Sequence, residues 1–500
     1  VGGAAVTEEF HPGFRNSVAA YTVSLLHPKI VRDLELPRHG FRVVERRLQN
    51  FLPLPDGRAL SVGADRTRAE VAKFSPRDAE RLDAYTARLS AVAGTLRELA
   101  LMTPPNLTQG GGLAGLREAF KAVRIARRIG RLGLAGERDL VEMFTLSAGD
   151  FLDRWFESDP IKAVYGFDAM VGHFASPYAP GSAYGLLHHA FGEVNGRPGQ
   201  WGHAIGGMGA ITQAMAAAAT ARGVEIRTAC PVREVIVERG RAAGVVTESG
   251  AAVRGGAVVS AINPKLLFTR MVDPGALPED FLARMSAYRV GSGTFRMNVA
   301  LAELPDFTAA PGREAAEHHT AGIIIAPSLA YMDRAWMDAR MNGWARQPII
   351  ELVIPSTLDD GLAPRGAHVA SLFCQHVRPS LPDGSSWDDH KEEVADLMVD
   401  TVDAYAPNFR RSVLARQVLS PLDLERTFGL TGGDIFHGVM DPGQLFSLRP
   451  LLGHADYRAP LPGLYMCSAG THPGGGVTGL PGHNAAREIL RDLRRPKRKE

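Results

Sequence analysis

One glycine-rich segment constrains the fold of this chain more than any other feature. Residues 474–479 have the spacing G-x-G-x-x-G. The apolar run 464–467 before them is typical of a buried strand, and Ala485, Ile489 and Leu493 after them have helical spacing. A strand, a glycine turn and a helix N-terminus bring backbone N–H donors together, with no Cβ atom to keep a ligand away. The spacing alone therefore favours equally a cradle for an anion or ring oxygen and a simple turn.

The same glycine spacing occurs a second time, at residues 110–115, in a different context. It follows Thr103, Pro104 and Pro105 rather than a strand candidate. A dinucleotide-binding turn needs a strand before it, so that the next helix points its N-terminus at the pyrophosphate. We therefore expect residues 110–115 to form a loop between helices.

The remaining sequence predicts a mixture of helices and strands. Helices are expected at 75–101, about 113–132, around 139–156, 207–222 and 388–405. Strands are expected at 224–228, 232–238, 243–247, 257–260, 322–325 and 349–354. This order of elements predicts an α/β or α+β protein with interleaved lobes.

Composition excludes several classes of protein. The 500 residues are 45% hydrophobic and 22% charged, as in soluble globular proteins of several domains. The net charge of +2 gives no electrostatic case for nucleic acid, and no apolar run reaches membrane-spanning length. Cys230, Cys374 and Cys467 are too far apart for a disulfide scaffold or a CxxC pair, which fits a reducing compartment such as the cytoplasm. The excess of Arg over Lys favours a bacterial origin.

Three stretches resemble a known family. Residues 464–490, LYMCSAGTHPGGGVTGLPGHNAAREIL, are similar to the C-terminal flavin-contacting motif of the phytoene desaturase-like FAD oxidoreductases, a group that includes carotenoid desaturases and isomerases. The segment from Gly206-Gly207-Met208 through 258–261 resembles the central flavin-domain segment of that family, and Val1-Gly2-Gly3 resembles its double-glycine stretch. The resemblance implies FAD as the cofactor. It implies flavin contacts at Gly2, Gly3, Val232, Gly470, Thr471, His472, Gly474, Gly475, Gly476, Val477 and Thr478.

The resemblance also implies three interleaved parts. These are a Rossmann-like FAD-binding domain (1–36, 200–289 and 455–500), a sheet-based substrate domain (37–74 and 290–454) and a helical cap (75–199). An apolar substrate, polyene or lipid-like, is expected to enter between the sheet and the cap. It would be desaturated, saturated or isomerised by flavin chemistry, which needs no obligatory acid–base residue. A flavin-free scaffold protein and an amine oxidase that releases hydrogen peroxide are the alternatives.

Residues 432–438, GGDIFHG, narrow the resemblance to the branch named pyridine nucleotide-disulfide oxidoreductase domain-containing protein 2. Without a CxxC pair, no thiol can attack and be resolved locally, so we exclude dithiol catalysis. Asp434 and His437 are weak candidates for moving a proton at the flavin. For Asp434 the stronger expectation is a hydrogen-bonded brace of the loop, because Asp beside Gly commonly closes turns.

The start of the sequence raises a separate expectation. Members of this family begin with a strand, a G-x-G-x-x-G turn, a helix and a second strand, whereas Val1-Gly2-Gly3 corresponds to the stretch that follows them. We expect the 500-residue form to bind FAD weakly or not at all. An upstream extension should restore stoichiometric flavin and raise thermal stability, because a ligand bound only to the native state stabilises it.

Two further groups of residues were considered as sites. His188, His189 and Glu193 lack the H-E-x-x-H spacing of a helical zinc site, so no metal is expected. The helix at 116–132 mixes apolar residues such as Leu116 and Phe120 with basic ones. Its basic residues are Arg117, Lys121, Arg124, Arg127, Arg128 and Arg131. Such a helix is either a solvated charged face or a contact with an anionic membrane.

Overall fold

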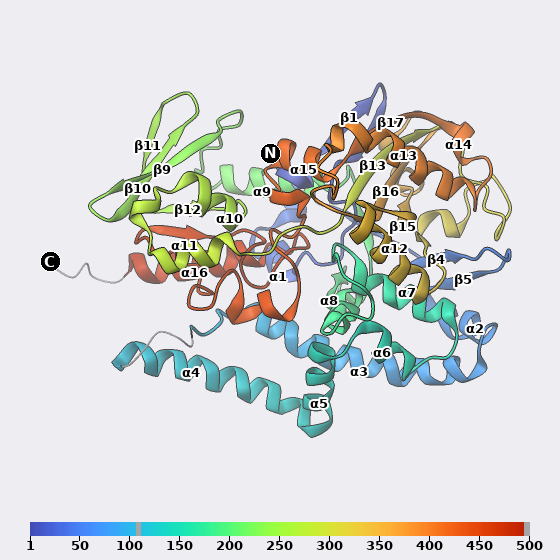
Figure 1. The fold of residues 1–500 in the computed structure, drawn as a ribbon, viewed down its shortest axis with the longest axis horizontal. Coiled ribbons are helices and arrows are strands. Elements are labelled where there is room, and N and C mark those ends of the chain that lie inside the picture. The colour runs from blue at the N-terminus through green and yellow to red at the C-terminus, as the bar shows by residue number, and fades with distance from the viewer. Residues whose placement is uncertain (107–111, 495–500) are drawn as a thin grey trace.

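The fold is organised around one large mixed sheet. The computed structural model describes residues 1–106 and 112–494. The sheet has seven strands in the order β17-β13-β16-β15-β14-β4-β5 (Figure 1). Their bounds are β17 Val413–Leu419, β13 Phe295–Leu301, β16 His368–Val377, β15 Trp344–Val353, β14 Gly322–Ile325, β4 Asn50–Pro53 and β5 Ala59–Val62. All neighbours are antiparallel except β14 and β4, which run parallel.

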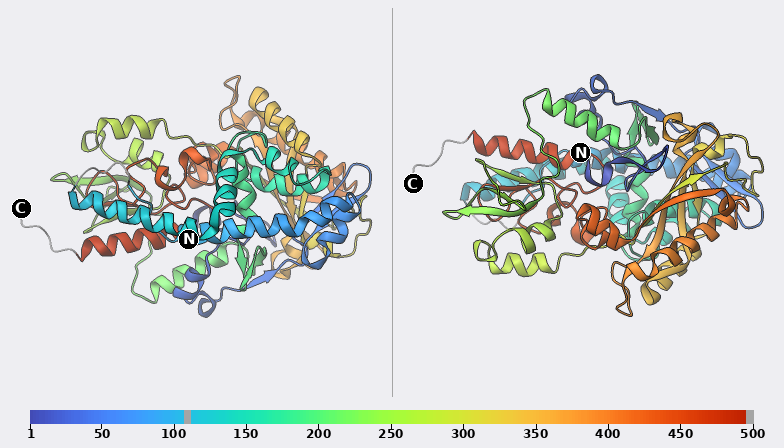
Figure 2. Two further views of the ribbon diagram at one scale, coloured as in Figure 1. Left: turned by 90° about the horizontal axis from the view of Figure 1, so that it is seen from below. Right: turned by 90° about the horizontal axis from the view of Figure 1, so that it is seen from above.

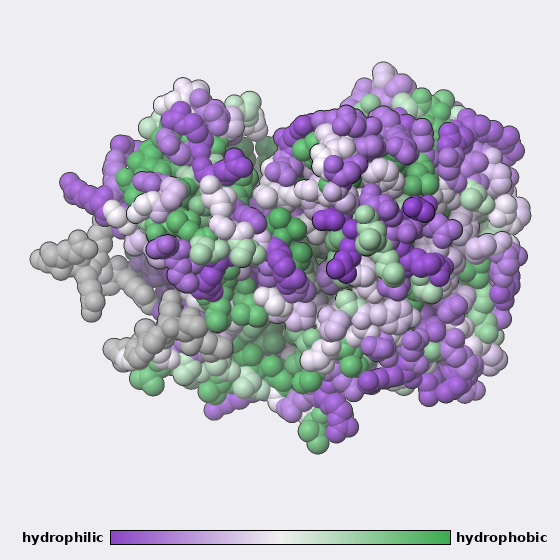
Figure 3. Space-filling model, viewed as in Figure 1, coloured by the Kyte–Doolittle hydropathy of each residue, from purple (hydrophilic) through white to green (hydrophobic). Residues whose placement is uncertain are grey.

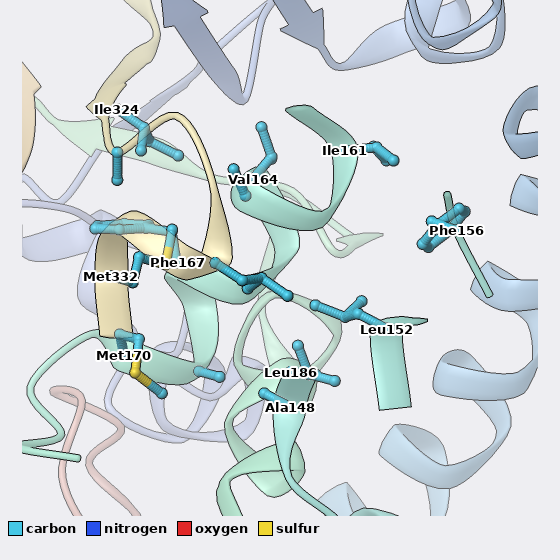
Figure 4. Packing of buried hydrophobic residues seen from close by; sticks show 14 of the residues in the cluster. Ala148, Leu152, Phe156, Ile161, Val164, Phe167, Met170, Leu186, Ile324 and Met332 are labelled. Atoms are coloured by element: carbon cyan, nitrogen blue, oxygen red, sulfur yellow. The ribbon is translucent and has the colours of Figure 1, made fainter. Parts of the chain in front are cut away.

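Both faces of this sheet are covered, which explains why most residues of its central strands are apolar and buried. Helix α13 (Trp387–Asp403) packs on one face together with Ile323 and Ile325 of β14. Ile324 points to the other face, because successive strand residues alternate, and it packs with Phe167 and Met332 (Figure 4). The two hydrophobic cores of this half therefore lie on opposite sides of one sheet.

The second core is built by a group of helices below the sheet (Figure 1). Their bounds are α2 Thr67–Ala72, α3 Pro76–Ala100, α5 Gly133–Thr145, α6 Ala148–Asp153, α7 Asp159–Met170, α8 Leu187–Phe191 and α12 Leu329–Asn342. Helix α4 (Gly112–Ile129) contributes no residue to this core. Ser75 caps α3 by accepting a hydrogen bond from the N–H of Asp78 at 3.1 Å. Seen from below, α4 and α3 follow one another across the molecule (Figure 2).

The prediction of one helix around 139–156 is wrong. The chain forms α5 and α6 instead, separated at Leu146 and Ser147. The Ser147 hydroxyl accepts from the N–H of Asp150 at 2.9 Å and so starts a new helix. The predicted loop at 110–115 falls partly outside the described residues, and α4 begins at Gly112.

The other half of the molecule is made of small sheets. β12 (Val258–Ser260) pairs in parallel with β18 (Leu464–Met466), and β9 (Val232–Glu238), β10 (Arg241–Thr247) and β11 (Ala252–Arg254) form an antiparallel sheet. Helices α9 (Gly209–Thr220) and α16 (Leu480–Leu493) belong to this half (Figure 1). The predicted strand at 224–228 is wrong: Val224 and Ile226 are exposed and pair with no strand of the described chain.

The remaining elements connect these parts. Their bounds are β1 Thr7–His11, β2 Phe14–Ser17, β3 Val43–Glu45, β6 Glu193–Val194, β7 Arg197–Pro198, β8 Gly202–Ala204, α1 Pro28–Asp33, α10 Pro264–Leu266, α11 Glu279–Ser286, α14 Phe409–Ser412 and α15 Pro421–Phe428. The mixed α/β fold class predicted from the sequence is confirmed. None of the described helices combines the length and apolar character needed to cross a bilayer.

Candidate cofactor and substrate site

The glycine-rich segment forms a loop between β18 and α16. The N–H of Cys467 donates to the Ser260 carbonyl at 2.8 Å, which extends the β12–β18 pairing by one residue into the loop. Gly474 and Gly476 have φ angles of 119° and 98°, in the left-handed region that favours glycine. α16 then begins with Gly479 as its N-cap. Gly479 has no side chain to cap the helix, but the N–H of Leu480 donates to the Thr478 hydroxyl at 3.1 Å and Pro481 has no N–H. The first turn therefore offers an anion or a ring oxygen at most the N–H of Gly482.

Neighbouring side chains come so close to Gly475 and Gly476 that only glycine fits at these two positions. A Cβ on Gly475 would lie 2.2 Å from Cδ1 of Phe436, and one on Gly476 would lie 2.5 Å from Cδ1 of Leu25. Both distances are far inside van der Waals contact. No residue with a side chain fits at Gly475 or Gly476, as expected. The groups that approach them in the structure are the side chains of Phe436 and Leu25 and not a ligand.

A second segment lies directly on this loop. The N–H of His27 donates to the carbonyl of Thr478 at 3.1 Å, and the N–H of Ala20 donates to the carbonyl of Ala4 at 3.0 Å. The chain from Ala20 to His27 thus runs between the Gly2–Gly3 stretch and the glycine loop. Val232 is placed elsewhere: it begins β9, in the three-stranded sheet, and is 37% exposed.

His472 is a buried, neutral imidazole in the loop. Its Nε2 lies 3.2 Å from the carbonyl of Leu99, which can only accept, so Nε2 carries the proton. Burial lowers the pKa of His472 to about 4. Its own carbonyl accepts from the Tyr457 hydroxyl at 2.9 Å, which is also bound by the Asn484 amide. These contacts hold the loop against α3 and α16, and His472 faces the cavity described below.

The two candidate proton carriers occupy the neighbouring loop. Asp434 is fully buried; its carboxylate accepts from the N–H of Gly291 at 2.7 Å and from the N–H of Phe436 at 2.8 Å. Burial raises its pKa. These are the contacts of a loop brace. His437 has a buried Nδ1 with no hydrogen-bond partner among the described residues, and burial lowers its pKa to about 4.

Arg449 joins these two loops, and sequence reasoning missed it. Its guanidinium is fully buried and donates only to backbone carbonyls. The five acceptors are Phe436, Gly438, Val439, Gln444 and Ala469. Ala469 leads into the glycine loop, whereas Phe436 and Gly438 belong to the loop of Asp434. No periodic pattern around Arg449 indicated this role, because its partners lie in irregular turns 5 to 20 residues away.

An apolar cavity of about 470 Å³ lies against the glycine loop. Gly475 and Thr478 of the loop line one side together with Phe436, Met440 and Phe446, and helices α3, α4, α5, α7 and α8 supply about half of the lining. The apolar lining includes Leu96, Leu99, Ala100, Ile125, Ile129, Leu140, Val141, Phe144, Val171 and Phe191. Its size is within the range of small-molecule sites. Among the described lining residues, Asp168 is the only carboxylate.

A buried polar cluster lies where the chain from Ala20 crosses the large sheet. The Tyr21 hydroxyl donates to the carboxylate of Glu351 in β15, and the guanidinium of Arg296 in β13 lies 4.6 Å from the centre of the Tyr21 ring. Nε and Nη1 of Arg296 have no hydrogen-bond partner among the described residues. Burial lowers the pKa of Arg296 and of Arg46, and the Glu351 carboxylate opposes both shifts. Charged residues within otherwise apolar strands are the sequence signal that could have revealed this cluster.

The residues present fit a bound FAD. Three features fit the group: the left-handed backbone of Gly474 and Gly476, the N–H of Gly482 in the first turn of α16, and the buried Nδ1 of His437, which has no hydrogen-bond partner among the described residues. The three cysteines are free; Cys374 is fully buried, and burial raises the pKa of Cys467 to about 11. Neither buried thiol has the lowered pKa of a reactive cysteine. The side chains of His188 and His189 lie outside the described residues.

Comparison with known proteins identifies the family. Residues 41–295 match the flavin containing amine oxidoreductase family. The chain is 41% identical to rat pyridine nucleotide-disulfide oxidoreductase domain-containing protein 2, over 99% of this chain and 88% of the rat protein. It is 24% identical to a lycopene-forming phytoene desaturase of Pseudescherichia vulneris, over 91% of this chain and 86% of that protein. The rat relative gives no support to the bacterial origin predicted from composition.

Solved structures agree on the fold. Putrescine oxidase bound to putrescine superimposes with a TM-score of 0.56 at 13% identity, covering 99% of this chain and 92% of the oxidase. At this identity the likeness shows the fold alone. The family match and the rat relative decide the assignment: the chain belongs to the flavin containing amine oxidoreductase family, is an oxidoreductase of that family, and has FAD as its cofactor.

Proposed function

We propose that the protein oxidises or reduces an apolar, polyene- or lipid-like molecule held in the cavity beside the glycine loop. One observation carries this proposal: Gly475 and Thr478, which belong to the flavin loop, line a cavity whose other walls are mostly apolar side chains. A substrate in this cavity would lie against the cofactor. The relative that forms lycopene acts on a polyene, which supports the same class.

Bound flavin supplies hydride or single-electron transfer to or from carbon, and the residues of this chain supply binding and orientation. Apolar helices α3, α4 and α5 bind the substrate by removing its surface from water. His472 stays uncharged and keeps its proton on Nε2, directed at Leu99. Asp434 is occupied by backbone donors. The chemistry proposed is accordingly desaturation, saturation or isomerisation without a dedicated acid–base residue.

Amine oxidation is the second candidate, because the family and putrescine oxidase share this fold. Asp168 is the carboxylate in the cavity wall that could face an ammonium group. A single carboxylate among mostly apolar residues favours the apolar substrate. A scaffold protein without flavin is the third candidate.

Anaerobic titration of the FAD-saturated protein distinguishes the candidates. We expect a polyene in detergent micelles to bleach the visible flavin bands, or the reduced protein to be reoxidised by such a polyene. Aliphatic amines should leave the spectrum unchanged. Bleaching of the flavin by an amine, with hydrogen peroxide released once oxygen is admitted, and no response to polyenes would establish the amine oxidase. A protein that takes up no added FAD in either the 500-residue form or the form extended upstream would establish the scaffold.

A further inference from the structure

Helix α4 is apolar on two opposite sides. Its inner side places Ile125 and Ile129 in the cavity wall. On its outer side Leu116, Phe120 and Val123 are 68%, 62% and 46% exposed, and their spacing of four and three residues places them on one face. A helix that only covered the cavity would have a polar outer face. The outer stripe therefore needs a separate explanation.

The exposed apolar surface continues beyond α4. Leu134 and Val141 of α5 are 75% and 60% exposed. Figure 3 shows apolar side chains along the lower edge of the molecule, over α4 and at the tip where α4 meets α5. We call Leu116, Phe120, Val123, Leu134 and Val141 the outer apolar face. Contiguous exposed apolar surface of this kind marks an interaction site.

Positive charge lies on and beside the outer apolar face, since Arg127, four residues after Val123, is on the same side of α4. Arg124, Arg127 and Arg131 are exposed, and within the described part of the chain no acidic side chain pairs with them. Other basic residues of α4 are engaged inward: Arg128 pairs with Glu98, and Lys121 pairs with Glu118 at 2.8 Å. An apolar stripe beside arginines complements a surface of anionic headgroups above acyl chains.

The cavity reaches this face. Val141 is both exposed and part of the cavity lining, so the wall formed by α4 and α5 separates the cavity from the outer apolar face by one layer of side chains. Figure 3 shows apolar side chains around the recess above α4. A molecule dissolved in acyl chains would meet the cavity at this edge without crossing water.

We propose that α4 and the start of α5 dock in the plane of a bilayer that contains anionic phospholipid, and that the substrate enters the cavity from this bilayer. The entry of substrate rests on the proposed function, whereas the docking does not. No described helix could span the bilayer, so the contact is peripheral. Its strength comes from burial of the outer apolar face and from the three arginines.

Vesicle flotation tests the docking. The protein should float with vesicles of equal parts phosphatidylcholine and phosphatidylglycerol, remain at the bottom with phosphatidylcholine alone, and dissociate at high salt. Arg124→Glu with Arg127→Glu should lower partitioning by about thirtyfold or more, since each basic residue contributes about fivefold. Phe120→Ser should lower it by about tenfold. Equal recovery with both kinds of vesicle, or full flotation of these variants, would overturn the proposal.

Matched controls separate docking from general effects. Arg365→Glu removes an exposed arginine near the β1–β2 hairpin, at the opposite side of the molecule from α4 (Figure 1). Met341→Ser removes a residue of α12 that is 72% exposed. Both should float like the unaltered protein. A loss of flotation in the controls equal to that in the α4 variants would contradict a specific surface.

The delivery of substrate has its own measurement. The Arg124→Glu and Arg127→Glu protein should bleach normally with polyene in micelles and at least tenfold more slowly with polyene in anionic vesicles. Flotation without any bleaching contradicts the proposed function alone. Bleaching by micellar polyene in a protein that does not float contradicts the docking alone.

Discussion

Nη2 of Arg449 donates to the carbonyl oxygen of Ala469 at 2.8 Å, and the same guanidinium also binds the carbonyl of Phe436. One side chain thus holds the Asp434 loop against the strand end that begins the glycine loop. Five carbonyls would lose their donor if it were removed, and buried carbonyls without donors are costly.

Arg449→Met should therefore destabilise the protein by about 3 kcal/mol or more and weaken flavin binding. Urea unfolding and FAD titration measure the two effects. Arg254→Met, at a side chain that is 61% exposed, is the control and should change stability by about 0.5 kcal/mol at most. Equal stability of the two variants would show that Arg449 is not the tie between the loops.

Gly476→Val should abolish flavin retention and leave the helical content nearly unchanged. The new Cβ would lie 2.5 Å from Leu25 at a φ of 98°, so the loop must move away from its cofactor-binding shape. Gly482→Ala in α16 is the control, since its Cβ would meet nothing within 4 Å. It should bind FAD normally and gain up to about 1 kcal/mol of stability. A yellow Gly476→Val protein would mean that residues 474–479 are not the cradle.

Glu351→Leu should destabilise the protein by about 3 to 5 kcal/mol, because it leaves the buried Arg46 and Arg296 without their carboxylate. Tyr21→Phe removes only one hydrogen bond and should cost about 1 kcal/mol. Urea unfolding of both variants gives the comparison. A larger loss of stability in Tyr21→Phe than in Glu351→Leu would show that the Glu351 carboxylate does not offset the charges of Arg46 and Arg296.

Stability should fall as the pH drops from about 6.5 to about 4. Burial lowers the pKa of His472 to about 4, and the unfolded imidazole titrates near 6.5. The unfolded state therefore takes the proton first, so the contribution of His472 is complete above pH 6.5 and is lost below it, up to about 3 kcal/mol. His472→Gln should reduce the pH dependence of the free energy of unfolding by the share of this residue, while His318, His376 and His437, whose pKa values burial lowers in the same way, keep the rest. Exchange of the partly exposed His39 serves as the control. If the free energy of unfolding changes with pH in the same way in the unaltered protein, the His472→Gln variant and the His39 variant, His472 does not contribute to the pH dependence.

Ala100→Phe should slow flavin bleaching by polyene at least tenfold, because the new ring fills part of the apolar cavity. Ala91→Phe, on the exposed side of the same helix, should react normally. Stopped-flow absorbance gives both rates. An unchanged rate in Ala100→Phe would place the substrate outside this cavity.

Contiguous signals allowed the unit of strand, glycine loop and helix to be predicted from sequence. β18, the glycines and α16 follow one another within residues 464–493, so local periodicity and turn chemistry were sufficient. The same held for β9, whose predicted bounds match the observed ones. The stretch 224–228 has strand-like residues and still forms no strand, because a strand also needs a neighbour to pair with.

Contacts between different segments of the chain could not be predicted from local sequence patterns. Tyr21 meets Glu351 only because the chain after β2 crosses the large sheet. Arg449 finds its acceptors in turns that have no periodic pattern. The cavity needs helices from one part of the sequence and the glycine loop from another. Each of these features depends on tertiary placement, which composition and spacing do not encode locally.

The parallel pair of β12 and β18 sets an order of events during synthesis. Val258 cannot pair until Leu464 has been synthesised. Every strand from β13 to β17 leaves the ribosome between these two residues. The large sheet can therefore fold while β12 is still without its partner, since segments fold as they emerge. A cofactor that binds at the glycine loop can therefore load only after β18 has emerged, which is late in synthesis. A nascent chain accordingly carries no reactive flavin while its apolar interior is still open to water.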